Sequence, residues 1–103
     1  MSKPSFKTGD LVEHARFKYR GVVVSVDPVF SGTDSWYKKV AKSRPPKNKP
    51  WYHILVDESN STTYVAERHL RQSANDQQVD HPMLGNFFNT FTGSRYLQRS
   101  ERI

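Results

Sequence analysis

The stretch FKTGDLVEHARFKYRGVVVSVDP, residues 6–28, decides the fold of this chain. Its second half holds four valines between Gly21 and Asp27-Pro28, and a short run of β-branched residues between turn formers is typical of a strand. Its first half contains a shorter alternating run, Leu11 to His14, which follows the turn pair Gly9-Asp10. Two strands joined this closely predict the first hairpin of a small antiparallel barrel.

Two further strands are expected downstream of this hairpin. Trp51–Val56 carries apolar residues at both odd and even positions, which indicates that both of its faces are at least partly buried. Thr62–Ala66 follows a polar turn and pairs with it as a second hairpin, and Glu67–His69 suggests one tight turn before Leu70. The predicted fold class is mainly β: a small SH3-like antiparallel β-barrel over residues 1–72.

A long basic loop, residues 36–50, separates the second predicted strand from the third. It holds six cations and no acidic residue, while the net charge of the whole chain is also +6. Asp34 can cap a short helical turn through Ala41, which Pro45-Pro46 would end. The loop either keeps a small protein soluble or contacts phosphates. The predicted nucleic-acid-binding residues come from the first hairpin and this loop: Arg16, Lys18, Arg20, Lys38, Lys39, Lys42, Arg44, Lys47 and Lys49.

Aromatic residues bracket the basic loop, and two interpretations of them stay open. Rings interleaved with cations suit a nucleic-acid surface, because rings stack on bases while cations contact phosphates. The same rings could instead anchor a long loop to the core. The residues are Trp36, Tyr37, Trp51 and Tyr52. Arg20 has an alternative role of its own, since a charge at a strand edge blocks pairing between sheets.

No pattern in the sequence indicates catalysis, a metal site or a cofactor. The four histidines do not fall at metal-ligand spacing, the glycines are isolated, and no acid and base are paired in a motif. There is no cysteine, no apolar leader and no membrane-length apolar window. We therefore expect a non-enzymatic cytoplasmic protein without a membrane partner.

The C-terminal part, residues 73–103, is predicted to contain a polar linker, a short helix over 83–91 and a disordered basic tail. The helix would carry one apolar stripe made of Leu84, Phe87, Phe88 and Phe91. A helix this short must dock on its own barrel, on a neighbouring subunit or on a partner, so the stripe is the predicted protein-binding surface.

The composition of the whole chain bears on its oligomeric state. Only 35% of the residues are apolar, and a core this small favours a homo-oligomer.

Several stretches resemble the bacterial HspQ family, the YccV-like, hemimethylated-DNA-binding domain. In the opening hairpin they are Phe6, Gly9-Asp10, Val12, His14, Tyr19-Arg20-Gly21-Val22-Val23, Val26 and Asp27-Pro28. Later they are Trp51-Tyr52-His53 with Leu55-Val56, Tyr64-Val65-Ala66-Glu67 with Leu70, and His81-Pro82. The resemblance implies a DNA-binding protein that prefers hemimethylated DNA.

The same resemblance implies an alternative function, a heat-shock adaptor that binds Lon protease and promotes degradation of selected substrates. The apolar stripe or the chain ends would then be the functional surface. A third possibility is a barrel that only self-associates, with its charge serving solubility. These three alternatives differ in where the functional residues must lie.

Overall fold

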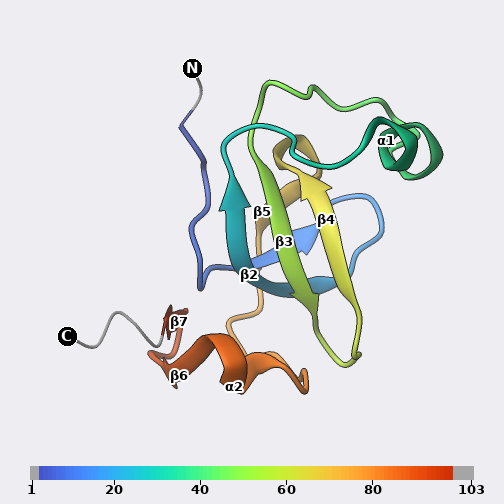
Figure 1. Cartoon of the computed structure of the whole chain (residues 1–103). Coiled ribbons are helices and arrows are strands. Elements are labelled where there is room, and N and C mark those ends of the chain that lie inside the picture. The colour runs from blue at the N-terminus through green and yellow to red at the C-terminus, as the bar shows by residue number, and fades with distance from the viewer. Residues whose placement is uncertain (1–2, 99–103) are drawn as a thin grey trace.

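The computed structural model describes residues 3–98, and its main feature is one antiparallel sheet in the strand order β4-β3-β2-β1-β5 (Figure 1). The strands are β1 (Leu11–His14), β2 (Arg20–Asp27), β3 (Trp51–Val56), β4 (Thr62–Ala66) and β5 (Leu70–Gln72). A 3-10 turn, η1 (Glu67–His69), joins β4 to β5, which are the two edges of the sheet. The predicted mainly β class is confirmed.

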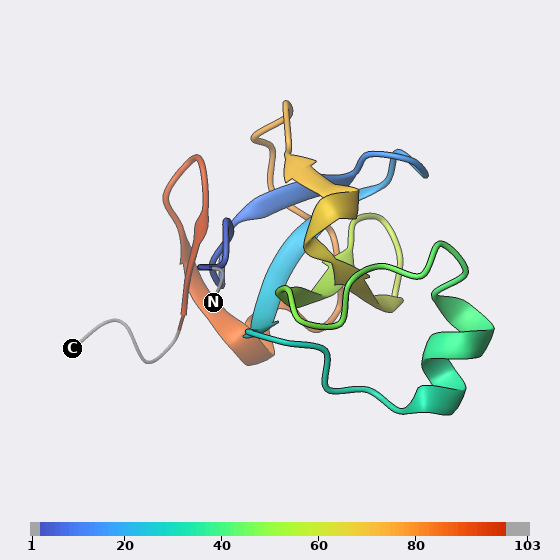
Figure 2. The same cartoon turned by 90° about the horizontal axis from the view of Figure 1, so that it is seen from above.

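Four further elements lie outside this sheet. The helix α1 (Asp34–Val40) belongs to the long loop between β2 and β3. Near the C-terminus, the short helix α2 (Leu84–Phe87) leads into a two-stranded hairpin of β6 (Phe88–Phe91) and β7 (Tyr96–Gln98). Seen from above, α1 and the C-terminal elements lie on opposite sides of the sheet (Figure 2).

The opening hairpin forms as predicted, with β1 paired antiparallel to β2. Its loop is held by the buried His14, whose Nδ1 accepts hydrogen bonds from the N–H groups of Arg16 and Phe17 at 3.2 and 3.1 Å. Gly21 is needed at the start of β2, because a Cβ there would lie 2.3 Å from the carbonyl oxygen of Leu55. The hairpin is therefore seated tightly against β3.

Both faces of the sheet are buried, as the pattern of β3 predicted. The sheet curls so that side chains from all five strands meet in an inner cluster. This inner cluster consists of Val12, Val23, Tyr52, Ile54, Val65 and Leu70. On the opposite face, Leu11, Val22 and Leu55 belong to a separate outer cluster. That face needs a second cover, since exposed apolar surface of this kind is unfavourable in water.

The C-terminal segment supplies the second cover. Val79, Phe88 and Tyr96 are buried and complete the outer cluster, and the Tyr96 hydroxyl accepts a 3.0 Å hydrogen bond from the Val79 N–H. The prediction of a linker followed by a disordered tail did not foresee this packing. The predicted tail residues 99–103 lie outside the described part of the chain.

The helix predicted over 83–91 is wrong in its length. It ends at Phe87, and Phe88–Phe91 continues as β6, which pairs with β7. Gly85, Asn86, Asn89 and Thr90 all have low helix propensity, so little free energy is lost when the helix stops after one turn. The strand conformation turns Phe88 into the outer cluster.

The basic loop is anchored by five rings: Phe30, Trp36, Tyr37, Trp51 and Tyr64. Two of them also donate hydrogen bonds to the proline segment, from the Tyr37 hydroxyl to the Pro45 carbonyl at 2.6 Å and from Trp51 Nε1 to the Pro46 carbonyl at 3.1 Å. The N-cap of α1 is Thr33 rather than Asp34, because the Thr33 hydroxyl accepts from the Trp36 N–H at 3.1 Å. The basic loop is therefore packed against the rest of the molecule and does not extend freely into solvent.

Arg20 fastens the polar segment between β5 and α2 to the sheet. Its guanidinium forms a 2.7 Å ion pair with Asp57, and the two side chains are only 14% and 15% exposed. It also donates to the carbonyl oxygens of Asn75 and Gln77, while Asp57 accepts from the Asp80 N–H at 2.7 Å. Arg20 therefore makes structural contacts within the chain. This placement differs from the prediction that Arg20 contacts a phosphate.

Replacing Phe88 with alanine is expected to lower the free energy of unfolding by about 3 kcal/mol, because it opens a cavity between the sheet and its C-terminal cover. Urea denaturation followed by circular dichroism measures the change. Thr90→Ala in the same strand is the control, since Thr90 is exposed. Equal stability of the two variants would show that the C-terminal segment does not stabilise the sheet.

Replacing Arg20 with glutamine is expected to lower the free energy of unfolding on the order of 3 kcal/mol, because it leaves a partly buried carboxylate without its partner. Arg16→Gln is the matched control, since Arg16 is exposed and a surface substitution usually changes stability by about 0.5 kcal/mol or less. Thermal unfolding of both variants provides the comparison. A stability loss of similar size in both would contradict the structural role of Arg20.

Candidate nucleic-acid interface

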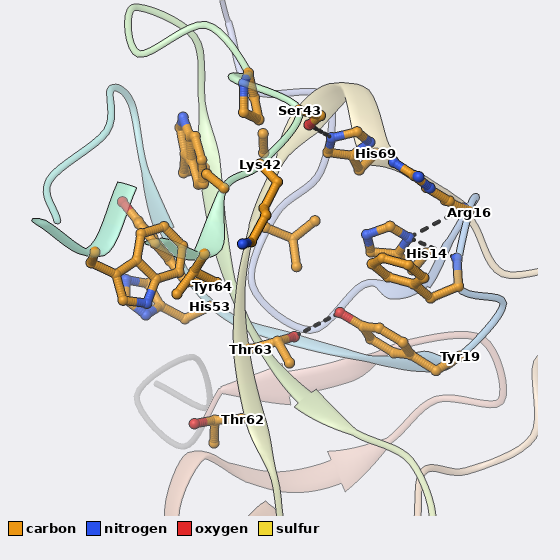
Figure 3. Close-up of a pocket in the computed structure, with 18 residues that line it drawn as sticks. His14, Arg16, Tyr19, Lys42, Ser43, His53, Thr62, Thr63, Tyr64 and His69 are labelled. Atoms are coloured by element: carbon orange, nitrogen blue, oxygen red, sulfur yellow. Dashed lines mark hydrogen bonds between the residues drawn. The ribbon is translucent and has the colours of Figure 1, made fainter. Parts of the chain in front are cut away.

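An open groove of about 760 Å³ lies between the β1–β2 loop, the strand β4 and the loop that carries α1. We call it the aromatic groove, because rings from all three segments line it (Figure 3). Its ring-bearing residues are His14, Phe17, Tyr19, Trp36, Trp51, His53, Tyr64 and His69. The cations among its lining residues are Arg16 and Lys42, and no aspartate or glutamate of residues 3–98 lines it.

The part of the groove nearest α1 is built on a hydrogen-bonded network around Asp27. The Asp27 carboxylate accepts hydrogen bonds from Ser31 Oγ at 2.6 Å and from the Tyr64 hydroxyl at 2.7 Å, and His53 Nε2 lies 3.1 Å away. Partial burial opposes ionisation, but these hydrogen bonds outweigh it and hold the pKa of the Asp27 carboxyl below its ordinary value. The network fixes the ring of Tyr64, which packs against Trp36.

The β1–β2 loop forms one rim of the groove. Phe17 stacks on His14, and the Arg16 guanidinium lies over the Phe17 ring, 5.7 Å from its centre. Burial, together with the neighbouring His69 and Arg16 charges, holds the pKa of His14 below its ordinary value. Arg16 is the cation of this rim that lines the groove.

The loop after α1 forms the opposite rim. Lys42 points over the middle of the groove in Figure 3, while Ser43 Oγ lies 2.8 Å from Nε2 of His69. Arg68 of η1 donates a 2.7 Å hydrogen bond to the Ser43 carbonyl, so the rim is tied to the turn between β4 and β5. Burial, and then the nearby Arg68 and Arg16 charges, lower the pKa of His69 as well.

The predicted cations divide into groups by their surroundings. Arg16 and Lys42 line the groove, whereas Lys18, Lys38, Lys39 and Arg44 are exposed on the same two loops but outside its lining. Lys49 is also exposed. Lys47 instead pairs with Asp34 at 3.0 Å and lies 4.4 Å from the centre of the Tyr37 ring, so it helps to hold the loop. Arg20 lies in the ion pair with Asp57, away from the groove lining.

The bracketing aromatics divide in the same way. Tyr52 and Trp51 are buried core residues, and Tyr37 anchors the proline segment, which fits the anchoring interpretation. Trp36 fits both interpretations, because it packs against Phe30, Trp51 and Tyr64 and also lines the groove with a half-buried ring.

Sequence reasoning missed most of the groove. Phe17 and Val40 are among the most exposed large apolar side chains of residues 3–98, yet no periodicity marks them. His53, Tyr64 and His69 lie on β3, β4 and η1. The antiparallel register of β3 and β4 places His53 opposite Tyr64, and tertiary structure brings these rings into one groove with the β1–β2 loop and the α1 loop. The exposure of Phe17 could have been predicted from the sequence, because an apolar residue between two cations in a tight loop is seldom buried.

The predicted protein-binding residues pack on the chain's own sheet. Phe88 is buried in the outer cluster, and Leu84, Phe87 and Phe91 are partly buried against it.

His81 makes contacts within the fold. It is buried, its Nε2 lies 3.0 Å from the Ser61 carbonyl and its Nδ1 accepts a hydrogen bond from the Met83 N–H. Across residues 3–98, no three His, Asp or Glu side chains gather as a metal site, and no helix is long and apolar enough to cross a membrane.

Asp27→Asn is expected to remove a pH-dependent contribution to stability. Because the pKa of Asp27 is lowered in the folded state, its carboxylate stabilises the fold above the ordinary value of 3.8, and the contribution is lost as the pH falls through the folded pKa. The difference in unfolding free energy between wild type and variant should shrink as the pH falls from about 6 to about 3. Urea denaturation across this range measures it; a constant difference would mean that the Asp27 charge does not stabilise the groove.

Comparison with known proteins identifies a matching family and several relatives. The family described as "Hemimethylated DNA-binding protein YccV like" matches residues 4–95. The chain is also similar to F-box only protein 21 of Homo sapiens, Mus musculus and Pongo abelii, with 29% identity over 98 residues in each case. These matches cover 93% of this chain but only 15% of the human protein and 16% of the other two.

The family match covers nearly all of the described residues, from the N-terminal segment through Arg95 of the C-terminal cover. It agrees with the resemblance found in the opening hairpin, and its description supports a DNA-binding role. The chain belongs to the YccV-like family of hemimethylated DNA-binding proteins.

Proposed function

We propose that this protein is a non-enzymatic DNA-binding protein that holds the phosphate backbone with cations on the two rims of the aromatic groove. The observation that carries the proposal is the placement of charge. Arg16 and Lys18 extend from the β1–β2 loop, while the α1 loop presents the exposed side chains of Lys38, Lys39, Lys42 and Arg44. Cations arranged in this way bind phosphates through release of counterions from DNA.

The anchoring of the basic loop supports phosphate binding over a purely solubilising role. A loop that only keeps a protein soluble has no need of a fixed conformation. This loop is held by five packed rings and by hydrogen bonds to the carbonyls of Pro45, Pro46 and Ser43. Because the backbone of the loop is already ordered, binding of a phosphate costs less conformational entropy, which favours affinity.

Hemimethylated DNA is the target that we propose from the family description. A comparison of duplexes of one sequence, methylated on neither strand, on one strand or on both, tests this part separately. Tightest binding of the duplex methylated on one strand is the expected result. Equal affinities would limit the function to DNA binding without this preference.

The alternative of a heat-shock adaptor for Lon protease has weaker support. The apolar stripe that would serve as its docking surface packs against the sheet of its own chain.

The proposal predicts a strong dependence of DNA affinity on salt. If the six cations Arg16, Lys18, Lys38, Lys39, Lys42 and Arg44 each contact one phosphate, the slope of log K against log salt concentration should be roughly −5. The double variant Lys38→Gln, Lys39→Gln should make this slope shallower by about 2. Fluorescence anisotropy of a labelled duplex at several salt concentrations measures both slopes.

A matched control removes the same charge from another part of the molecule. Lys3 and Lys7 are exposed on the N-terminal segment, which lies across the molecule from α1 (Figures 1 and 2). The double variant Lys3→Gln, Lys7→Gln should leave the slope unchanged. An equal effect of both double variants would show that net charge alone governs binding, and a wild-type slope near zero would overturn the proposed function.

A further inference from the structure

The aromatic groove contains exposed apolar side chains and rings that phosphate binding alone does not require. Phe17 and Val40 stand on its two rims and are 67% and 56% exposed. Between them, Trp36, His53 and Tyr64 are only partly buried. Apolar side chains exposed on both sides of one groove favour a ligand with flat apolar faces.

The charge of the groove decides which flat ligand fits it. Aromatic cages that bind alkylated ammonium groups exploit the attraction between a cation and the faces of rings. In this groove Arg16 and Lys42 are present and no carboxylate lines the surface, so a basic ligand would be repelled. The Asp27 carboxylate is already occupied by its contacts with Ser31, Tyr64 and His53. An anionic ligand with aromatic groups satisfies both the rings and the cations.

The shape of the groove separates paired from unpaired nucleic acid. Paired bases in a duplex expose only their edges, and reading these edges requires an element that protrudes into a DNA groove. The aromatic groove is concave, and its volume of about 760 Å³ lies within the range of about 300–1,000 Å³ that is typical of small-molecule sites. It can therefore accept bases that leave the stack, but not a double helix.

We propose that the aromatic groove binds a few unpaired nucleotides, with their bases on the rings of Phe17, Trp36 and Tyr64 and their phosphates on Arg16 and Lys42. This inference rests on the proposed DNA binding and deepens it by naming the form of DNA that the groove accepts. The unpaired nucleotides can come from a single strand or from bases that leave a duplex, since both present the same faces and phosphates.

Three labelled DNAs of related sequence test the proposal on the full-length protein by fluorescence anisotropy: a single strand, a fully paired duplex, and the same duplex with a three-nucleotide bulge. The single strand, the bulged duplex or both should bind at least fivefold more tightly than the paired duplex. A preference for only one of them identifies the source of the unpaired nucleotides. Equal affinity for all three DNAs overturns the inference but leaves the proposed function intact, whereas no salt-dependent binding of any DNA overturns both.

A pair of variants tests the groove itself. The double variant Phe17→Ala, Val40→Ala should weaken binding of the preferred unpaired DNA about tenfold, which is near the low end of the effect of losing one stacked base. The matched control is Val29→Ala, Met83→Ala, which removes exposed apolar side chains outside the groove. Circular dichroism verifies that both variants fold. Equal affinities of the two variants would overturn the assignment to this groove.

A measurement on the unmodified protein covers the case in which the groove variant does not fold. Trp36 lines the groove and is partly exposed, while Trp51 is buried, so a base that stacks in the groove should quench the emission of Trp36. We expect quenching by the preferred unpaired DNA and little quenching by the paired duplex. Binding without any quenching would overturn the stacking that we propose.

Discussion

The burial of both faces of the central strands is the constraint on which the rest of this structure depends. Ile54 of β3 packs into the inner cluster and Leu55 into the outer cluster, and both are fully buried. A single curled sheet can close over only one of its own faces. The chain therefore has to provide a second layer, and Val79, Phe88 and Tyr96 provide it. Without that layer the outer face would remain in contact with water.

A third cluster, made of the five rings that anchor the basic loop, is distinct from the inner and outer clusters. The rings that surround Trp51 hold the α1 loop at the edge of the sheet, and they do so through side-chain donors directed at proline-segment carbonyls. Proline has no N–H, so such a segment cannot form ladders of its own and depends on donors from elsewhere. As a result, the backbone of the loop is held in place while its lysine and arginine side chains remain exposed.

Local patterns predicted the elements well where the residues themselves determine the conformation. The valine run of β2 and the two-sided apolar pattern of β3 were interpreted correctly, as was the short helix before Pro45-Pro46. The C-terminal part was interpreted poorly. Its apolar residues are spaced too widely to suggest a layer, and the spacing of Leu84, Phe87 and Phe91 imitates a longer helix than the one present.

The sequence by itself determined the four strands β1–β4, the position of the basic loop and the family, because these follow from neighbouring residues and their order. Tertiary structure decided which charges are available, since Arg20 and Lys47 differ from Arg16 and Lys42 only in the partners that folding brings to them. It also created the aromatic groove, whose rings come from segments far apart in the chain. The physical reason is that periodicity records which face of a strand is apolar, whereas a groove depends on how the curled sheet brings its edge and loops together.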